Sequence, residues 1–559
     1  MKILQESSRI RLARWLLVTG SLAGCNMITG ADSIVLERRR GDSTASAGGE
    51  ATSGETVGPA TVGGFDDDGA SGTSGSGASG PGSGPGTAVT SASSVSVAVS
   101  SSMAATTGGG ADDPPPPPPP PPGPPAVTNA ADGVAVVDVK LYQAVEVPLT
   151  KASDIPIVAG KDALVRVFYQ VQSGYDGKPV TARFMAGDGY AESTQVLSGS
   201  STQGVLGSTA NIKVPGSLLK VGGTFRVDLV QANGSGTNSA AGYPQGTGQT
   251  PHNAKSAGTK LRVVLVPVMN GGSLPDTTPA QVKKYTDFIR WQYPIPEVEV
   301  TVRAQHYTYN GSLWGYGGWS DLLQEISDLR DGDNVDPEVY YYGIHNAQSS
   351  GLLGLGWVAG SKDVWSRAAI GVGWTGDTAP ETAVHELGHN HGRSHSPCGV
   401  DGDWNYPHPG AKIGVWGYHP GKDKLLDPSK HVDFMSYCDP PWVSDHTYKA
   451  LYTRLKSVNG AKVIYPAELM NRTWERVKVL EGVATFVDSI TLAYPPSGEA
   501  KKVTVTSSNG TEEIEGQYLA YNHLEGGLLY VLRPKFVESD ASPLTVAFDV
   551  GGKSVAIAR

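Results

Sequence analysis

Three histidines within eleven residues, His385, His389 and His395, constrain this chain of 559 residues more than any other feature. On an α-helix, side chains four residues apart lie on one face, so His385 and His389 can direct two imidazoles at one point. A straight helix would carry His395 about 9 Å further along its axis, so the chain must turn back for a third imidazole to join them. Gly392 lies where such a turn can occur, because glycine adopts positive φ at a helix end at little cost. The spacing predicts a helix that starts near Ala379 and a sharp turn at Gly392.

Three neutral imidazoles with a fourth position open to water are the ligands of a catalytic rather than a structural zinc ion. Glu386 directly follows the first histidine and is not among the three ligands. We expect its carboxylate to act as general base on a water molecule activated by zinc, and then as general acid toward the leaving amine. His391 lies two residues beyond His389, off the ligand face, and is expected to be exposed to solvent.

The stretch HELGHNHGRSH resembles the extended zinc signature of the metzincin metallopeptidases, whose second hallmark is a Met-turn. Asp433–Cys438, DFMSYC, resembles that turn, with Met435 lying 40 residues after His395. The resemblance implies that Met435 supports the three imidazoles from below. It implies that Tyr437 matches the tyrosine of astacin-like and serralysin-like members, which stabilises the oxyanion of the reaction; an ordinary core tyrosine is the alternative.

The resemblance covers about residues 259–461 and implies a metzincin-like α/β catalytic domain built from a twisted sheet and helices. In metzincins the strand before the active-site helix forms the edge of the substrate cleft. Gly351–Gly360 is the candidate for that strand, with glycines that leave the backbone accessible and Trp357 lining a subsite; a glycine-rich connecting loop is the alternative. Ser396 matches neither astacins nor serralysins, so the subfamily stays open. The overall plan is most similar to secreted bacterial metzincins such as the mucin-cleaving lipoprotein group.

The N-terminal residues predict export. Basic residues precede an apolar run that is too short to span a bilayer and ends in LAGC, which resembles the lipoprotein cleavage box. Residues 1–25 are therefore predicted to be a lipoprotein signal peptide with Cys25 as the lipidated residue; a plain signal peptide or an internal start are the alternatives. Residues 26–130 are rich in Gly, Ser, Thr and Pro, with nine consecutive prolines at 114–122, and predict a disordered tether.

The remaining chain predicts a multidomain fold. Alternating apolar runs favour a β-sandwich over residues 131–258, and mixed α/β patterns over 259–468 favour the metzincin-like zinc metallopeptidase domain. Alternating runs return over 469–559 and favour a small C-terminal β domain, with Gly551–Gly552 as a two-residue hairpin turn. Two helices of the central domain are expected to start at Thr278–Pro279 and at Ser320.

Two smaller features bear on stability and on cations. Cys398 and Cys438 lie beside the zinc motif and the Met-turn, and export makes a disulfide between them possible in an oxidising environment, although sequence alone does not prove the bond. Clustered acidic side chains could bind calcium, but they fit no complete EF-hand loop, so a solvated turn between a helix and a strand is the favoured interpretation and a calcium site is the alternative. These side chains are Asp331, Asp333, Asp336 and Glu338.

Charge excludes one class of partner: the net charge is -10, and no run of lysine or arginine is present that would neutralise a row of phosphates. We expect no nucleic-acid partner. The combined features predict an exported, lipid-anchored zinc endopeptidase that cleaves proteins or glycoproteins. We expect it to be a monomer that contacts the membrane only through its lipid. Its expected location is the cell envelope, with the outer membrane as the default. A surface adhesion or glycan-binding lipoprotein with an inactive metzincin domain is the alternative. A zinc hydrolase that acts on amides other than peptide bonds is a third interpretation of the motif.

Overall fold

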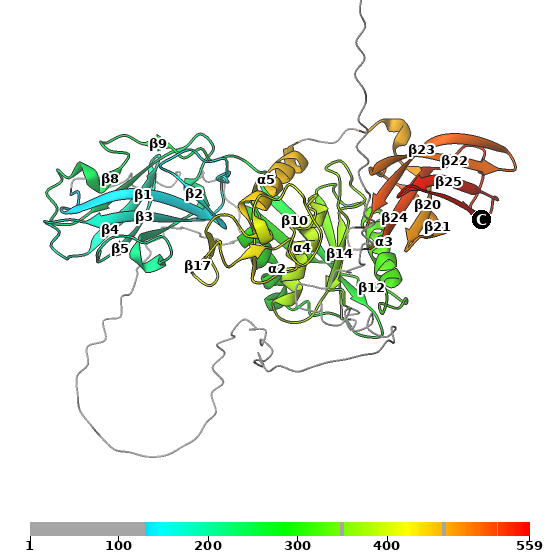
Figure 1. The fold of residues 1–559 in the computed structure, drawn as a ribbon, viewed down its shortest axis with the longest axis horizontal. Coiled ribbons are helices and arrows are strands. Elements are labelled where there is room, and N and C mark those ends of the chain that lie inside the picture. Colours follow the sequence, from blue (N-terminus) through cyan, green and yellow to red (C-terminus); the bar gives the residue numbers. More distant parts are fainter. Residues whose placement is uncertain (1–128, 347–350, 461–464, 522–523) are drawn as a thin grey trace, which may run out of the picture.

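The computed structural model describes residues 129–346, 351–460, 465–521 and 524–559. Cys25, the predicted signal peptide and nearly all of the predicted tether lie outside these residues. Figure 1 shows three parts in a row, a β part in cyan, a central part with helices in green and yellow, and a second β part in orange and red. Within the described ranges, no helix has both the length and the apolar character needed to cross a bilayer.

The first part consists of two antiparallel sheets around one core. The strand orders are β17-β16-β2-β1-β3-β6 and β5-β4-β7-β8, with β9 paired to β7. Buried side chains from both sheets, including Val165, Phe184 and Phe225, belong to this core. The strands of this part are β1 (Val134–Gln143), β2 (Val145–Pro148), β3 (Ala163–Val171), β4 (Val180–Ala186), β5 (Gly189–Gln195), β6 (Ala210–Val214), β7 (Thr224–Val230), β8 (Gly242–Tyr243) and β9 (Thr250–Pro251).

Two strands of the first sheet come from residues that follow the histidine motif. They are β16 (Gly417–His419) and β17 (Lys424–Leu426), which form a hairpin and continue the sheet at β2 through Gly417 and Val145. Trp442 also reaches the first part, because its indole N–H donates to the carbonyl of Ala144 at 3.0 Å. The first sheet thus contains residues from both sides of residue 258.

The central part is a sheet of order β11-β10-β13-β15-β14, with the short strand β12 beside β10. All pairs are parallel except that of β14 with β15, which is antiparallel, and β14 ends the sheet. The strands are β10 (Lys260–Met269), β11 (Glu297–Val302), β12 (Tyr307–Thr308), β13 (Val339–His345), β14 (Gly354–Gly356) and β15 (Ala368–Val372). The helices are α2 (Pro279–Gln292), α3 (Tyr316–Gly332), α4 (Thr378–Asn390) and α5 (Asp445–Gly460).

The two faces of the central sheet pack against different helices. Leu261, Val263 and Leu265 of β10 share a core with α2 and α4. Val266 and Val268 share another core with α3. Because successive strand residues point to opposite faces, a strand covered on both sides reads as one apolar run, which explains LRVVLVPV in the sequence.

The starts of the first two helices test the sequence predictions. α2 begins at Pro279, and the backbone N–H of Gln281 donates to the side chain of Thr278, so that prediction is confirmed. The prediction that Ser320 caps the next helix was wrong, because α3 begins one turn earlier at Tyr316. Trp319 is fully buried in the core on this first turn, and the Ser320 hydroxyl donates to the carbonyl of Gly317 instead of capping the helix.

The last part is one antiparallel sheet of order β21-β20-β24-β23-β22-β25-β26. Both Gly551 and Gly552 have positive φ between the paired residues Val550 and Lys553, which confirms the predicted hairpin turn. The strands are β20 (Arg472–Leu480), β21 (Val483–Leu492), β22 (Glu499–Ser507), β23 (Gly510–Ala520), β24 (Gly526–Leu532), β25 (Thr545–Val550) and β26 (Lys553–Ala558).

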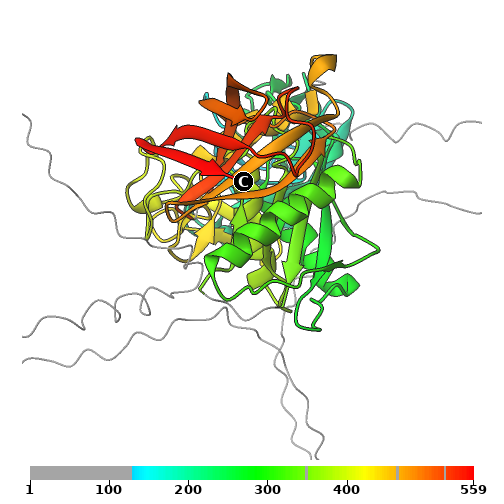
Figure 2. The same cartoon turned by 90° about the vertical axis from the view of Figure 1, so that its right-hand side faces the viewer.

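Helix α3 joins the central and last parts. Figure 2 shows it beside the last sheet, with the central strands behind. Its buried residues share a core with Trp474, Leu528 and Tyr530 of the last sheet, and Arg476 of β20 pairs with Asp328 of α3 at 2.7 Å. The two parts are therefore packed as one body at this interface.

Candidate metal centre

Helix α4 carries the first two histidines and lies within the protein interior. It starts at Thr378, one residue before the predicted start, with Asp377 as its N-cap residue. Of its residues from Ala379 to Asn390, all but Glu381 are buried. The helix packs on β14 and β15 on one side and lies against Phe434 and Met435 on the other. Both imidazoles are thus held on rigid backbone.

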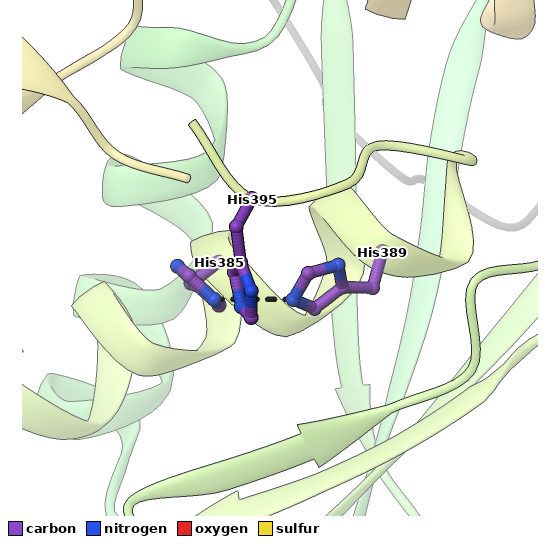
Figure 3. Close-up of side chains that lie close together, drawn as sticks. All are labelled: His385, His389 and His395. Carbon is purple, nitrogen blue, oxygen red and sulfur yellow. Dashed lines mark hydrogen bonds between the residues drawn. The ribbon is translucent and has the colours of Figure 1, made fainter. Parts of the chain in front are cut away.

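The three histidines meet at one point, as Figure 3 shows. The nitrogen atoms that His385, His389 and His395 offer as ligands all lie within 4.8 Å of one another, and each residue is at most 4% exposed. The Nε2 atoms of His385 and His389 are 3.1 Å apart. Two nitrogens bound to one zinc ion at tetrahedral angles are about 3.3 Å apart, since each Zn–N bond is about 2.0 to 2.1 Å long. The spacing of this pair is compatible with both imidazoles binding one metal ion of that size.

Backbone carbonyls orient the two helical imidazoles. Nδ1 of His385 donates to the carbonyl of Phe434 at 2.7 Å, and Nδ1 of His389 donates to that of Arg393 at 2.6 Å. A carbonyl only accepts, so each Nδ1 carries the proton and each Nε2 keeps its lone pair for the metal position. Such outer hydrogen bonds fix both the tautomer and the ring direction of a metal-binding histidine.

Gly392 makes the turn that brings His395 back. Its φ is +77°, and the next N–H, that of Arg393, donates to the carbonyl of Gly388 at 3.0 Å, which closes the helix end. A Cβ at this position would also lie 2.5 Å from Nη2 of Arg454. Both the backbone conformation and the close approach of the guanidinium therefore require glycine here.

Glu386 lies against the edge strand β14. It is fully buried, and a Cβ on Gly354 would lie 2.6 Å from its Cδ, while one on Gly356 would lie 3.2 Å from its Oε2. Gly351–Gly360 thus contains the last strand of the sheet, but Gly354 and Gly356 are buried and make room for Glu386 rather than exposing the backbone. Burial raises the pKa of Glu386 to about 8, and a cation bound beside it would lower that pKa again.

Met435 and Tyr437 both lie close to the three histidines. Met435 is fully buried, and a side chain on Gly388 would collide with its sulfur, so the methionine packs against α4 between its two histidines. The Tyr437 ring lies 4.7 Å from the His395 ring and 6.0 Å from that of His385. The structure therefore brings both residues to the site.

Two further contacts hold the segments around His395 and Met435 together. Cys398 and Cys438 form a disulfide, with 5.8 Å between their Cα atoms. Asp433 accepts hydrogen bonds from the N–H groups of Met435 at 2.8 Å and Ser444 at 3.0 Å, and from the Ser396 hydroxyl at 3.2 Å. Sequence reasoning missed Asp433. An aspartate two residues before a turn residue often bonds its backbone in this way, and that signal was present.

The prediction of an exposed His391 was wrong. It is 2% exposed, its ring stacks on Tyr340 at 4.6 Å, and its Nδ1 donates to the carbonyl of Leu387 at 2.6 Å. The residue does point away from the metal, but that direction leads to the central sheet. Burial lowers its pKa to about 3, so it is neutral at physiological pH.

The proposed subsite role of Trp357 was also wrong. Trp357 is 1% exposed, stacks on Tyr521 of the last part at 5.1 Å and donates its indole N–H to the Ser327 hydroxyl at 2.9 Å. Trp357 directly follows β14, in which two of the three residues are glycines without side chains. Its large ring therefore fills space between the central sheet and α3. It therefore belongs to the core shared with the last part.

The acidic residues considered for calcium have protein partners. Asp336 and Glu338 both pair with Arg262, and Asp333 pairs with Arg303, while Asp331 accepts from the N–H of Ala493. Among the described residues, the group of three or more side chains suited to hold a metal ion is the histidine group alone. The calcium expectation therefore has no cluster of oxygen ligands to support it.

Comparisons with known proteins leave this geometry as the main source of functional information. No family model matches the chain, and no curated protein matches it. Among solved structures, the chain is similar to one described as "Structure of a chaperone-substrate complex", with 12% identity and a TM-score of 0.23 over 45% of this chain and 40% of that chain. A similarity at that TM-score carries no argument about fold or function.

Proposed function

We propose that this protein is a zinc-dependent endopeptidase of the metzincin type, which hydrolyses peptide bonds of proteins or glycoproteins. The observation that carries the proposal is the convergence of three buried histidines, two of which keep Nε2 free of the proton, next to the buried carboxylate of Glu386. Three imidazoles with one open position are the donor set of a catalytic zinc ion.

Each residue at the site has a distinct role in this mechanism. His385, His389 and His395 would hold the ion, which would supply Lewis-acid chemistry when bound. The Glu386 carboxylate accepts the proton of the attacking water and delivers it to the leaving amine. The phenol of Tyr437 donates a hydrogen bond to the carbonyl oxygen that becomes negative during attack. Met435 packs against Gly388 of α4, between the two helical histidines, and so supports the helix that carries them.

The proposal includes export and a lipid anchor at Cys25, which locate the enzyme in the cell envelope, with the outer membrane as default. It also includes a monomeric state and membrane contact through the lipid alone. These parts rest on the N-terminal sequence, and labelling of the mature N-terminus with a radioactive fatty acid tests them: a Cys25→Ser variant should incorporate none.

The decisive experiment measures zinc and proteolysis together in the exported protein. Glu386→Gln preserves size and buried polarity, so it should retain one zinc ion per chain and lose about 10² to 10⁴-fold in rate, the range that a general base contributes. His395→Ala should lose the metal as well. Glu512→Gln, an exposed carboxylate in the last part, is the matched control and should behave as wild type. Unchanged proteolysis in Glu386→Gln, or a wild-type protein without zinc, would contradict the proposal.

A further inference from the structure

The loop after the third histidine packs against the backbone of that histidine. The N–H of Asp403 donates to the carbonyl of His395 at 2.7 Å. A Cβ on Gly402 would lie 2.1 Å from the same carbonyl oxygen, so the close approach of this loop requires glycine there. His395 itself lies beyond the end of α4, after the turn at Gly392. The contact with Asp403 therefore fixes a peptide group that the helix does not contain.

The side chain of Asp403 is paired with Arg393. Its Oδ2 accepts from Nη2 of Arg393 at 3.3 Å, and both side chains are largely buried, with 19% and 15% of their surface exposed. The carbonyl of Arg393 accepts from Nδ1 of His389 at 2.6 Å. One aspartate thus contacts the backbone of the third histidine directly and is connected to the ring of the second through a single residue.

Two other groups hold the carboxylate of Asp403 in place. The N–H of Asn405 donates to its Oδ1 at 2.9 Å, which is a common way for an aspartate to stabilise a turn. Nε2 of His446, in the first turn of α5, lies 3.1 Å from Oδ2 of Asp403 and 3.1 Å from Nη2 of Arg393. The carboxylate therefore connects its own loop, the segment after α4 and the start of α5.

The segment from Arg393 to His395 determines where the third imidazole meets the other two. Asp403 contacts this segment at both ends, through the guanidinium of Arg393 and through the carbonyl of His395. The side chains of a working metal site have to be held to within about 0.5 Å of their productive positions. Outer contacts that orient metal-binding histidines commonly change metal affinity by about 10- to 100-fold when they are removed.

We propose that Asp403 is a positioning residue of the metal centre, which holds His389 and His395 in the arrangement that binds one ion. Asp403 contacts neither the ion nor the substrate, and it acts through Arg393 and through the backbone of His395. This inference rests on the proposed zinc function, because it concerns the orientation of two of the three ligands. It makes the loop around Asp403 part of the metal centre.

The test measures the zinc affinity of the full chain by competition with a chromogenic chelator. Asp403→Ala removes every contact of the carboxylate and should weaken zinc binding by about 10- to 100-fold. Asp403→Asn keeps an oxygen for the N–H of Asn405 but loses the negative charge toward Arg393, so its affinity should lie between those of Asp403→Ala and wild type. Cobalt(II) in place of zinc reports on the ligand arrangement through its visible absorption, and the spectrum of Asp403→Ala should differ from that of wild type.

Asp333→Ala is the matched control, because it also removes a partly buried ion pair. Asp333 pairs with Arg303 at 2.7 Å, its side chain is 25% exposed, and it also accepts from the hydroxyl of Tyr341. The control should unfold at a lower temperature than wild type and retain the wild-type zinc affinity and cobalt spectrum. A loss of zinc affinity in Asp403→Ala no larger than in this control would overturn the proposal. If Asp403→Ala does not fold, Asp403→Asn decides, and wild-type affinity in that variant overturns the proposal.

Peptide cleavage by the same preparations separates this inference from the peptidase proposal. If wild type binds zinc but cleaves no peptide, and Asp403→Ala weakens zinc binding, the positioning role stands and the peptidase proposal fails. If wild type cleaves peptides and Asp403→Ala binds zinc as tightly as wild type, the positioning role fails and the peptidase proposal stands. A wild-type protein that binds no zinc overturns both.

Discussion

Gly354→Ala tests how closely the edge strand controls the carboxylate of Glu386. The new Cβ would lie 2.6 Å from the Glu386 Cδ, whereas ordinary contacts begin at 3.4 Å. Gly354 does not have positive φ, so alanine causes no backbone strain and the effect is purely steric. Because Glu386 is fully buried on a helix packed on both sides, the carboxylate must move by about 1 Å to relieve the overlap.

A displacement of this size has a calculable effect on the proposed reaction. A misplacement of about 1 Å costs about 10²-fold in rate, which corresponds to about 2.7 kcal/mol of transition-state stabilisation. The strain in the folded state should lower the free energy of unfolding by about 1 to 3 kcal/mol. Zinc content should stay at one ion, because the three atoms nearest to the new methyl group all belong to Glu386 and not to a histidine.

The assay is kcat/KM on a peptide substrate, with zinc content and thermal unfolding measured on the same preparations. Gly360→Ala is the control from the same segment, because a Cβ there would have no neighbour closer than 4.0 Å, and it should match wild type in all three measurements. If Gly354→Ala retained the wild-type rate, the position assigned to the Glu386 carboxylate would be refuted.

Three other predictions concern stability. Replacing both Cys398 and Cys438 by alanine should lower the free energy of unfolding by about 4 kcal/mol, the value that the chain-entropy model gives for a closed loop of about 40 residues. Adding a reductant should lower the free energy of unfolding of wild type by the same amount and leave that of the variant unchanged. Asp363 is buried, and burial raises its pKa to about 6, so its ionisation destabilises the fold as pH rises from about 4 to 6. The free energy of unfolding of Asp363→Asn, measured by denaturant titration, should exceed that of wild type by up to about 3 kcal/mol at pH 8 and should equal it at pH 3. Trp357→Ala should lower stability by about 3 to 5 kcal/mol and leave substrate preference unchanged, whereas altered cleavage sites would restore a subsite role for the ring.

Local sequence rules predicted the parts of the site that depend on neighbouring residues. The four-residue spacing of His385 and His389, and the freedom of Gly392 to adopt positive φ, depend only on helix geometry and on the missing Cβ. The Gly551–Gly552 turn follows from the same property of glycine. Such features need no knowledge of distant segments, so the sequence was sufficient for them.

Tertiary packing decided everything that depends on what lies opposite a side chain. His391 and Trp357 were expected at a solvent-exposed position and at a subsite, but their rings stack on Tyr340 and Tyr521 instead. Asp433 acquires its role only because Ser396 and Ser444 lie beside it, although they come from other segments. The sequence by itself determined which residues can bind a metal and where the chain can turn, since both are local properties. Only the tertiary structure decided which other side chains surround that metal position, because their contacts span tens to hundreds of residues.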